Sequence, residues 1–135
     1  MIPTVERLMS TKIHSVSVEK NIRAAAEEMA RHQIGSLLVT REGSYVGIIT
    51  EVDIIRKIVA KGIDPASVSV KEAMTSPLVT IDANRSVLDA NDLMEQKRIR
   101  HLGVTRNGKV IGIVSIRDFL HPLHVEEAEQ QASGF

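Results

Sequence analysis

Cysteine is absent from the 135-residue chain. Without a thiol, the protein cannot be a disulfide-stabilised scaffold, a cysteine-ligated zinc or iron–sulfur protein, or an enzyme with a thiol nucleophile. We therefore expect no required cofactor of these kinds. The same absence leaves the redox compartment open, because a chain without cysteine is compatible with any compartment.

Aromatic side chains and an excess of one charge are also scarce. The sequence has no tryptophan, and its aromatic residues are Tyr45, Phe119 and Phe135. Seventeen basic and 17 acidic residues give a formal net charge of zero. Proteins that bind single-stranded nucleic acid use aromatic platforms and basic grooves. Nucleic acid is therefore an unexpected partner.

Long apolar runs are missing as well. No stretch reaches the roughly 18 apolar residues of a membrane-spanning helix, and the N-terminus lacks the basic start and apolar stretch of a signal peptide. We expect no membrane partner and a cytoplasmic location. Apolar residues still make up 43% of the chain, a share typical of a globular protein that buries a core.

The sequence does contain a tandem repeat. A shift of 65 residues superposes the chain on itself without a gap. A register held over most of the chain indicates a duplicated supersecondary unit. We predict a first repeat over residues 1–65, a second over 66–123 and an acidic tail over 124–135. The identical pairs include Met9 and Met74, Ala25 and Ala90, Met29 and Met94, Gly43 and Gly108, Gly47 and Gly112, and Asp53 and Asp118.

Each copy carries the signals of a β-α-β-β-α unit. A short extended stretch precedes a helix that Asn21 or Ser86 caps, and the apolar residues of that helix recur at helical spacing. Two apolar strands follow, and a second helix begins after Thr50 or Ser115. In the first copy this helix runs to a stop near Gly62.

The turns between the paired strands support this order. The first copy has Glu42-Gly43 and the second has Asn107-Gly108, and a tight hairpin needs positive φ at both turn positions. One copy alone buries little apolar surface. We therefore predict an α/β fold in which two β-α-β-β-α repeats pack as a pseudo-twofold pair with two equivalent clefts.

A short string closes the second strand of each copy. It reads Gly47-Ile48-Ile49-Thr50-Glu51-Val52-Asp53 in the first copy and Gly112-Ile113-Val114-Ser115-Ile116-Arg117-Asp118 in the second. With these two strings at one offset inside two full repeats, nearly the whole chain resembles a tandem pair of the CBS domain family. The stretches Leu8-Met9-Ser10-Thr11 and Ala73-Met74-Thr75-Ser76 resemble the family's opening segment. The chain departs from the family at Leu38 and Gly103, where members often carry proline.

The resemblance implies a regulatory, non-catalytic module that binds AMP, ADP, ATP or S-adenosylmethionine in clefts between its repeats. It also implies self-association into a homodimer and a regulated protein partner. Each cleft would draw on both repeats. One would combine Ser115, Arg117 and Asp118 with Thr11, Ile13, Ser15, Ile34 and Gly35. The other would combine Thr50, Val52 and Asp53 with Ser76, Leu78, Thr80, Ile99 and Arg100.

The repeated string suits a nucleotide chemically. A carboxylate accepts hydrogen bonds from ribose hydroxyls, which fits Asp53 and Asp118. A hydroxyl beside free backbone N–H groups suits a phosphate, which fits Thr50 and Ser115. Adenine needs flat apolar walls. The candidates for these walls are Ile13, Ile34, Ile48, Leu78, Ile99 and Ile113.

A purely structural interpretation of the same strings stays open. Thr-x-x-Asp and Ser-x-x-Asp are also helix N-caps with an acid in the first turn, worth about 1 kcal/mol each. The local string alone favours this capping role, whereas the repeat context favours the nucleotide role. Both roles are compatible with each other.

The two predicted sites differ in charge. Arg117 stands where the first copy has Val52, and Arg100 stands opposite Gly35. By the resemblance, Arg100 takes a position that often faces a phosphate. In the alternative interpretation, Arg100 is a solvated cation near a helix end, where it interacts favourably with the helix dipole.

The five histidines do not predict a metal or a catalytic site. His14 and His32 have no partner at ligand spacing, and His121 and His124 flank Pro122 without a third ligand nearby.

Three other function classes remain as rivals. The first is an interaction module with vestigial clefts, the second is a nucleic-acid binder using residues 97–101, and the third and least expected is an enzyme.

Overall fold

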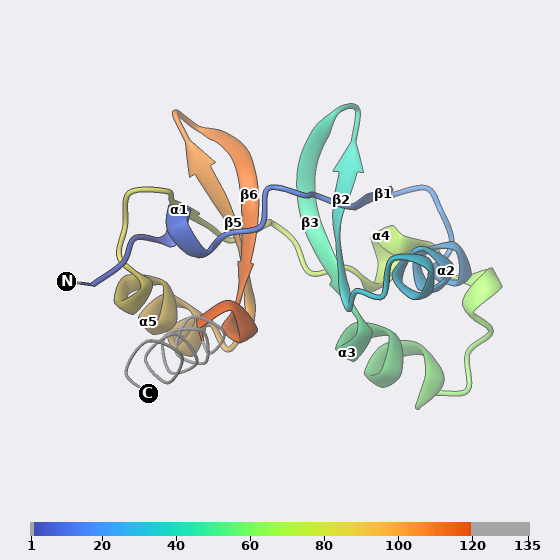
Figure 1. Cartoon of the computed structure of the whole chain (residues 1–135). Helices are drawn as coiled ribbons and strands as arrows, with labels where there is room; N and C mark the ends of the chain where they lie inside the picture. Colours follow the sequence, from blue (N-terminus) through green and yellow to red (C-terminus); the bar gives the residue numbers. More distant parts are fainter. Residues whose placement is uncertain (1, 120–135) are drawn as a thin grey trace, which may run out of the picture. The chain divides into compact units, whose positions relative to one another are not determined.

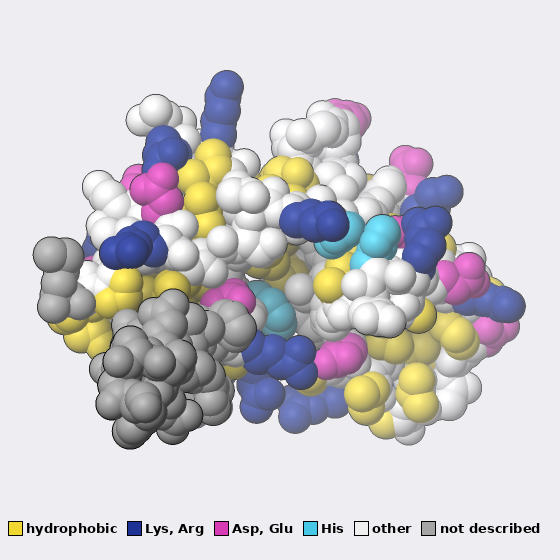
Figure 2. All heavy atoms as spheres, in the orientation of Figure 1, with side chains coloured by type: hydrophobic (Ala, Val, Ile, Leu, Met, Phe, Trp, Pro, Cys, Tyr) yellow, Lys and Arg dark blue, Asp and Glu magenta, His cyan; other side chains and the backbone are white. Residues whose placement is uncertain are grey.

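The computed structural model describes residues 2–119, which form two compact units (Figure 1). One unit comprises Ile13–Val79, and the other combines Met1–Lys12 with Thr80–Phe135. Within the described residues no helix is long and apolar enough to cross a membrane. Lysine, arginine and acidic side chains are interspersed on the face drawn in Figure 2, in keeping with the balanced composition. The predicted acidic tail over 124–135 lies outside the described residues.

The Ile13–Val79 unit contains the first β-α-β-β-α series. Its three-stranded sheet has the order β1-β2-β3, in which β1 and β2 are parallel and β2 and β3 are antiparallel. The elements are β1 (Ser15–Ser17), α2 (Ile22–His32), β2 (Ser36–Arg41), β3 (Ser44–Thr50), α3 (Glu51–Ile54), the π-helix η1 (Ile55–Val59), the 3-10 helix η2 (Pro65–Ser67) and α4 (Val70–Ala73).

The second unit repeats this topology. Its sheet has the order β4-β5-β6 with the same parallel and antiparallel pairing. Residues 116–119 after β6 are helical, as the repeat predicts. The elements are α1 (Val5–Leu8), β4 (Thr80–Asp82), α5 (Val87–Lys97), β5 (His101–Arg106) and β6 (Lys109–Ser115). The predicted β-α-β-β-α order is confirmed.

The two long helices begin at the predicted caps. Asn21 Oδ1 accepts a hydrogen bond from the Ala24 N–H at 2.8 Å, and Ser86 Oγ accepts one from the Asp89 N–H at 3.1 Å. These bonds satisfy backbone donors that have no partner inside the helix. Both helices end at a residue in the left-handed conformation, Gln33 in α2 and Arg98 in α5.

The hairpins have the predicted turns. Glu42 and Gly43 have φ values of 50° and 82°, and Asn107 and Gly108 have 52° and 78°. Positive φ at both central residues matches the twist of the flanking strands. The turns therefore set the register that pairs each second strand with its neighbour.

The core of the Ile13–Val79 unit lies between α2 and one face of its sheet. Ile22, Ala25 and Met29 of α2 are buried, as their helical spacing predicts. They pack in one cluster with four strand residues, with Val18 and with residues of the following helices. These partners are Val16, Val18, Leu37, Val39, Ile49, Ile58, Val70 and Ala73.

The compact units are divided at different residues from the predicted sequence repeats. Val5 donates its N–H to the Arg85 carbonyl at 2.8 Å, and Ser10 pairs with Ile113. The start of the first predicted repeat therefore pairs with β6 of the second unit, and the start of the second predicted repeat pairs with β3 of the Ile13–Val79 unit through Thr75 and Ile48. The short helices α1 and α4 in these segments were not predicted, since four residues show no helical period.

Candidate functional site

The candidate site is built on one row of residues across each sheet. In the Ile13–Val79 unit, Ser15 pairs with Leu38, and Leu38 pairs with Ile48. Ile48 then forms a bridge to Thr75, with both backbone bonds at 2.9–3.0 Å. Four chain segments thus meet side by side. This row brings the predicted residues Ser15 and Ile48 together and places Ser76 next to its last member.

The predicted residues Ile48 and Thr50 lie on the sheet face away from the core. Leu38 is buried, yet it is not part of the cluster that holds Leu37 and Val39. Successive side chains of a strand point to opposite faces. Leu38 and its cross-strand neighbour Ile48 therefore point to the face opposite α2. Thr50 lies two residues beyond Ile48 and follows the same alternation.

The second unit has the same row. Thr80 pairs with Gly103, Gly103 pairs with Ile113, and Ile113 exchanges two backbone bonds with Ser10. Thr80 and Ile113 are predicted site residues, and Thr11 follows Ser10 directly. The repeated geometry shows that the duplicated sequence positions occupy duplicated places in the two sheets.

The glycine that opens each repeated string is required because a neighbouring backbone segment lies very close to it. A Cβ atom added at Gly47 would lie 2.6 Å from the Thr75 carbonyl oxygen, and one at Gly112 would lie 2.8 Å from the Ser10 carbonyl oxygen. Both distances are shorter than real Cβ contacts. The glycines therefore let the neighbouring segment pair with β3 or β6. This role was not predicted.

Thr50 and Asp53 form a capping box at the start of α3. The Asp53 Oδ2 atom accepts hydrogen bonds from the Thr50 N–H at 3.0 Å and from the Thr50 hydroxyl at 3.1 Å. The Thr50 Oγ1 atom accepts one from the Asp53 N–H at 3.3 Å. The capping interpretation of Thr-x-x-Asp is therefore correct for the first string.

Lys57 occupies the other oxygen of the same carboxylate. Its Nζ atom lies 3.0 Å from Asp53 Oδ1 and donates to the Ala73 carbonyl at 2.8 Å. The Asp53 side chain is 13% exposed, and the Lys57 side chain is 43% exposed. Lys57 was not predicted as a site residue. Its spacing of four residues from Asp53 on a helix was the available signal.

Ser115 and Asp118 repeat two of the three capping-box bonds, without the lysine. The Asp118 Oδ2 atom accepts from the Ser115 N–H at 2.7 Å and from the Ser115 hydroxyl at 3.3 Å. Within residues 2–119, the other carboxylate oxygen has no hydrogen bond. The residue 65 positions after Lys57 is Pro122. It lies outside the described residues, and its side chain carries neither a charge nor a donor.

The charged positions next to the two strings differ between the units. The Glu51 N–H donates to the Gly35 carbonyl at 2.9 Å, and the Ile116 N–H donates to the Arg100 carbonyl at 3.0 Å. These two hydrogen bonds occupy equivalent places. The first involves the acid Glu51, and the second involves the cation Arg100. Arg117 is exposed beside Asp118.

Arg100 borders a groove of about 380 Å³ in the second unit. Met94, Ile99 and Ile116 provide apolar surface there, and Arg98 supplies another cation. Asn91 and Glu95 also line the groove, so one acid stands among its cations. The apolar side chains suit a flat ring, and the guanidinium groups suit an anionic group. The structure thus brings two predicted residues, Ile99 and Arg100, to one concave surface.

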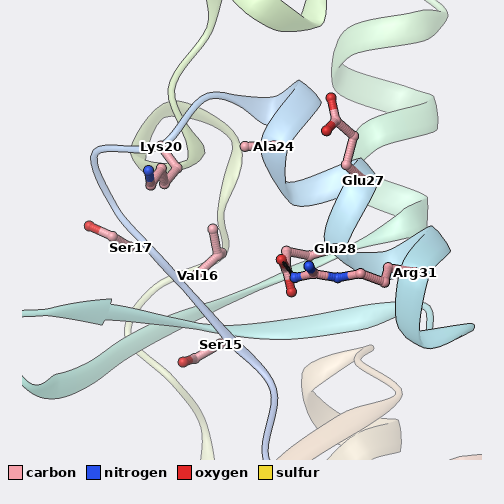
Figure 3. A pocket seen from close by; sticks show the side chains of 8 residues that line it. All are labelled: Ser15, Val16, Ser17, Lys20, Ala24, Glu27, Glu28 and Arg31. Carbon is pink, nitrogen blue, oxygen red and sulfur yellow. Dashed lines mark hydrogen bonds and ion pairs between the residues drawn. The ribbon is translucent and has the colours of Figure 1, made fainter.

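A larger groove of about 540 Å³ lies between β1 and α2 in the other unit (Figure 3). Ser15 is the predicted site residue that lines it. Glu28 and Arg31 point toward each other and form an ion pair, whereas Glu27 points away. Because opposite charges neutralise each other along this groove, it offers no distinct electrostatic preference.

The predicted residues divide between the two units. Each predicted cleft takes residues from both units, so its assembly stays a prediction. The Ile13–Val79 unit holds Ile13, Ser15, Ile34, Gly35, Ile48, Thr50, Asp53, Ser76 and Leu78. The other unit holds Thr11, Thr80, Ile99, Arg100, Ile113, Ser115, Arg117 and Asp118.

Two histidines form a contact that the sequence did not predict. The rings of His14 and His32 lie 4.1 Å apart between centroids, and His32 Nε2 lies 3.2 Å from Glu28 Oε2. Among residues 2–119, no three histidine or carboxylate side chains are placed to hold a metal ion. His121 and His124 lie outside this range.

Comparison with known proteins supports the resemblance. The CBS domain family model matches residues 5–60 and 70–124. The CBS domain-containing protein YhcV of Bacillus subtilis is 32% identical over 131 residues, which cover 97% of this chain and 90% of that protein. A CBS-domain-containing protein of Agrobacterium tumefaciens is 30% identical with a TM-score of 0.82, and the match covers 90% and 93% of the two chains. The hexameric CBS-CP12 protein of bloom-forming cyanobacteria is 28% identical with a TM-score of 0.83, and covers 89% and 67%.

Proposed function

The chain belongs to the CBS domain family, and on this basis we propose that it is a cytoplasmic regulatory module that binds an adenosine nucleotide and does not catalyse a reaction. The observation that carries the proposal is the duplicated Thr/Ser-x-x-Asp geometry. In both units the aspartate Oδ2 atom is held by the N–H and the hydroxyl of the residue three positions earlier. A carboxylate fixed in this way is pre-organised for a ligand.

The ribose is the part of the ligand that this geometry fits. The bonds from Thr50 or Ser115 use Oδ2, so Oδ1 is the atom that accepts from a ribose hydroxyl. Acidic residues bind ribose hydroxyls in this way in dinucleotide-binding folds. A nucleotide with vicinal hydroxyls is therefore preferred over its 2′-deoxy form.

The remaining predicted residues serve the base and the phosphates. Ile48 and Ile113 occupy equivalent places on the two sheets and supply apolar wall for adenine. Arg100 and Arg117 are exposed cations in the second unit and bind phosphate oxygens. S-adenosylmethionine carries the same adenosine and is the alternative ligand without phosphate.

Occupancy of the site acts on a partner. A ligand shifts a conformational equilibrium only by its difference in affinity for the two states. A protein that recognises one of those states then responds to the ligand. We include a homodimer in this proposal, since the cyanobacterial relative is described as hexameric and therefore self-associates.

An interaction module with vestigial clefts is the second candidate. Val52, Ile55 and Val59 are 40%, 57% and 64% exposed. They recur at helical spacing on α3 and η1, so they form an exposed apolar stripe. Contiguous exposed apolar surface marks protein contact sites. This candidate needs no nucleotide.

A thermal melt with AMP, ADP, ATP, S-adenosylmethionine and NAD separates the two candidates. A ligand at about 100 times its Kd adds roughly 2.7 kcal/mol. For a chain of this size that raises Tm by about 8–10 °C. We expect a shift with at least one ligand and a smaller shift with its 2′-deoxy form. The double variant Asp53→Asn and Asp118→Asn should lose the shift. No shift with any ligand favours the interaction module.

A further inference from the structure

We propose that Lys57 is a latch on the first ribose site, so that the two repeats bind nucleotide unequally and the Asp118 site fills first. This inference rests on the proposed function and assigns a regulation to it. The latch consists of the Lys57 ammonium, the Asp53 carboxylate and the Ala73 carbonyl. All three groups belong to the Ile13–Val79 unit.

Counting acceptor positions shows why the sites differ. An ionised carboxylate has about four lone-pair positions. The Thr50 N–H and hydroxyl take two of these on Asp53, and Lys57 takes a third. One position remains, whereas two vicinal ribose hydroxyls that both donate need two. A nucleotide that uses both hydroxyls on Asp53 must therefore displace Lys57.

Asp118 does not meet this obstacle in the described part of the chain. The Ser115 N–H and hydroxyl take two positions on its Oδ2 atom. The positions on Oδ1 remain for both ribose hydroxyls. Position 122, which corresponds to Lys57, is proline and offers no ammonium group. The sequence difference therefore makes the second site the accessible one.

The Lys57 contacts compete with the ribose hydroxyls for Asp53, but they are weak enough for a nucleotide to displace them. An ion pair with a partly exposed lysine contributes little in water. The second bond, to the Ala73 carbonyl, adds to the cost of moving the ammonium. Ala73 is the last residue of α4, and Thr75 pairs with Ile48 two residues later. Release of Lys57 therefore removes a donor from the Ala73 carbonyl and leaves the two Thr75–Ile48 bonds in place.

Titration calorimetry of the full chain tests the latch. AMP, ATP and S-adenosylmethionine are used as probes, because all three carry vicinal ribose hydroxyls. We expect one strong site per chain in the unchanged protein. Asp118→Asn should weaken that site about tenfold or more, and Asp53→Asn should weaken it less than Asp118→Asn does. Lys57→Met should add a second site. Lys61→Met, which replaces an exposed lysine four residues further along the chain, should not.

The outcomes separate the latch from the proposed function. Two equal sites in the unchanged protein, or an unchanged titration of Lys57→Met, overturn the latch and leave nucleotide binding intact. No binding by any variant removes the proposed function and the latch with it. If Lys57→Met does not fold, Lys57→Gln removes the charge and keeps a donor for the Ala73 carbonyl. A double-mutant cycle of Asp53→Asn and Lys57→Gln by urea unfolding must show non-additive midpoint shifts without ligand, and additive shifts would overturn the latch.

Discussion

The Lys57 ammonium lies 3.0 Å from Asp53 Oδ1, four residues along the helix that Thr50 caps. Thr50 and Lys57 thus hold the two oxygens of one carboxylate, but they differ in what they stabilise. The Thr50 hydroxyl satisfies a helix N–H that has no other partner, whereas the Lys57 ammonium remains partly hydrated. Removing each should therefore have a different effect on folding.

We expect Thr50→Ala to lower the free energy of unfolding by about 1 kcal/mol, within the 0.5–2 kcal/mol typical of lost N-caps. Lys57→Met should lower it by less than about 1 kcal/mol, because the ion pair is partly exposed. Urea unfolding followed by circular dichroism gives both values. Ser86→Ala is the matched control, because Ser86 Oγ accepts a hydrogen bond from the Asp89 N–H as a cap in the second unit. A larger loss for Lys57→Met than for Thr50→Ala would contradict the assignment.

The contact of Gly47 with the neighbouring segment gives a second prediction. Gly47→Ala places a Cβ atom 2.6 Å from the Thr75 carbonyl oxygen, which is backbone and cannot rotate away. We expect a loss of about 1–3 kcal/mol, the range of overpacked sites. At Gly35 the added Cβ would meet the end of the flexible Glu51 side chain at 2.9 Å. Gly35→Ala should therefore be milder in the same unfolding experiment, and equal losses would refute the steric explanation.

Stability should also fall in acid through two carboxylates. The backbone N–H and then the hydroxyl of Ser69 lower the pKa of Glu72. The bond from the Arg85 guanidinium lowers the pKa of Asp89, and burial acts in the opposite direction. A carboxyl whose pKa is lower in the folded state stabilises the protein above its unfolded pKa. That stabilisation is lost as the pH falls below about 4.5 for Glu72 and 3.8 for Asp89.

Urea midpoints between pH 7 and pH 3 measure this dependence. Glu72→Gln should make the acid fall shallower, since the titrating group is gone. Glu19→Gln removes an exposed carboxyl for which no side-chain hydrogen bond is found among the described residues, and it should leave the profile nearly unchanged. If Glu72→Gln follows the unchanged protein through the acid range, the capping bond to Ser69 does not act on folding.

Much of the fold could be predicted because each signal occurs twice. The Asn21 and Ser86 caps, the two hairpin turns and the spacing of Ile22, Ala25 and Met29 are local, and local signals depend on near neighbours. The packing of residues 2–12 against the second repeat does not depend on near neighbours in the sequence. The pairing of Ser10 with Ile113 joins segments far apart in the sequence, and no pattern within either segment specifies it.

The candidate site was only partly predictable for a related reason. The Thr50–Asp53 spacing indicates a cap, and the structure has that cap. The same helix widens into a π-helix at Ile55–Val59, which no residue pattern predicted. Lys57 follows Asp53 at a spacing that many exposed pairs share, so the spacing alone did not single it out. Its bond to the Ala73 carbonyl depends on where α4 packs.

Arg100 gives the sharpest test of ligand class. It is exposed at the groove that Ile99 and Ile116 line, and its counterpart in the first repeat is Gly35. A guanidinium bond to a charged oxygen is worth about 1.5–3 kcal/mol, or about tenfold in affinity per 1.4 kcal/mol. Arg100→Ala should therefore weaken ATP and ADP about tenfold or more while leaving adenosine nearly unchanged.

The contrast between ligands decides the role of this residue, because adenosine shares the base and ribose but has no phosphate. Salt should weaken ATP binding to the unchanged protein more than to Arg100→Ala, since screening acts on the charge that the variant lacks. Lys97→Ala removes a nearby exposed cation that does not line the groove and serves as the control. If Arg100→Ala weakens all three ligands equally, Arg100 shapes the groove and does not bind phosphate.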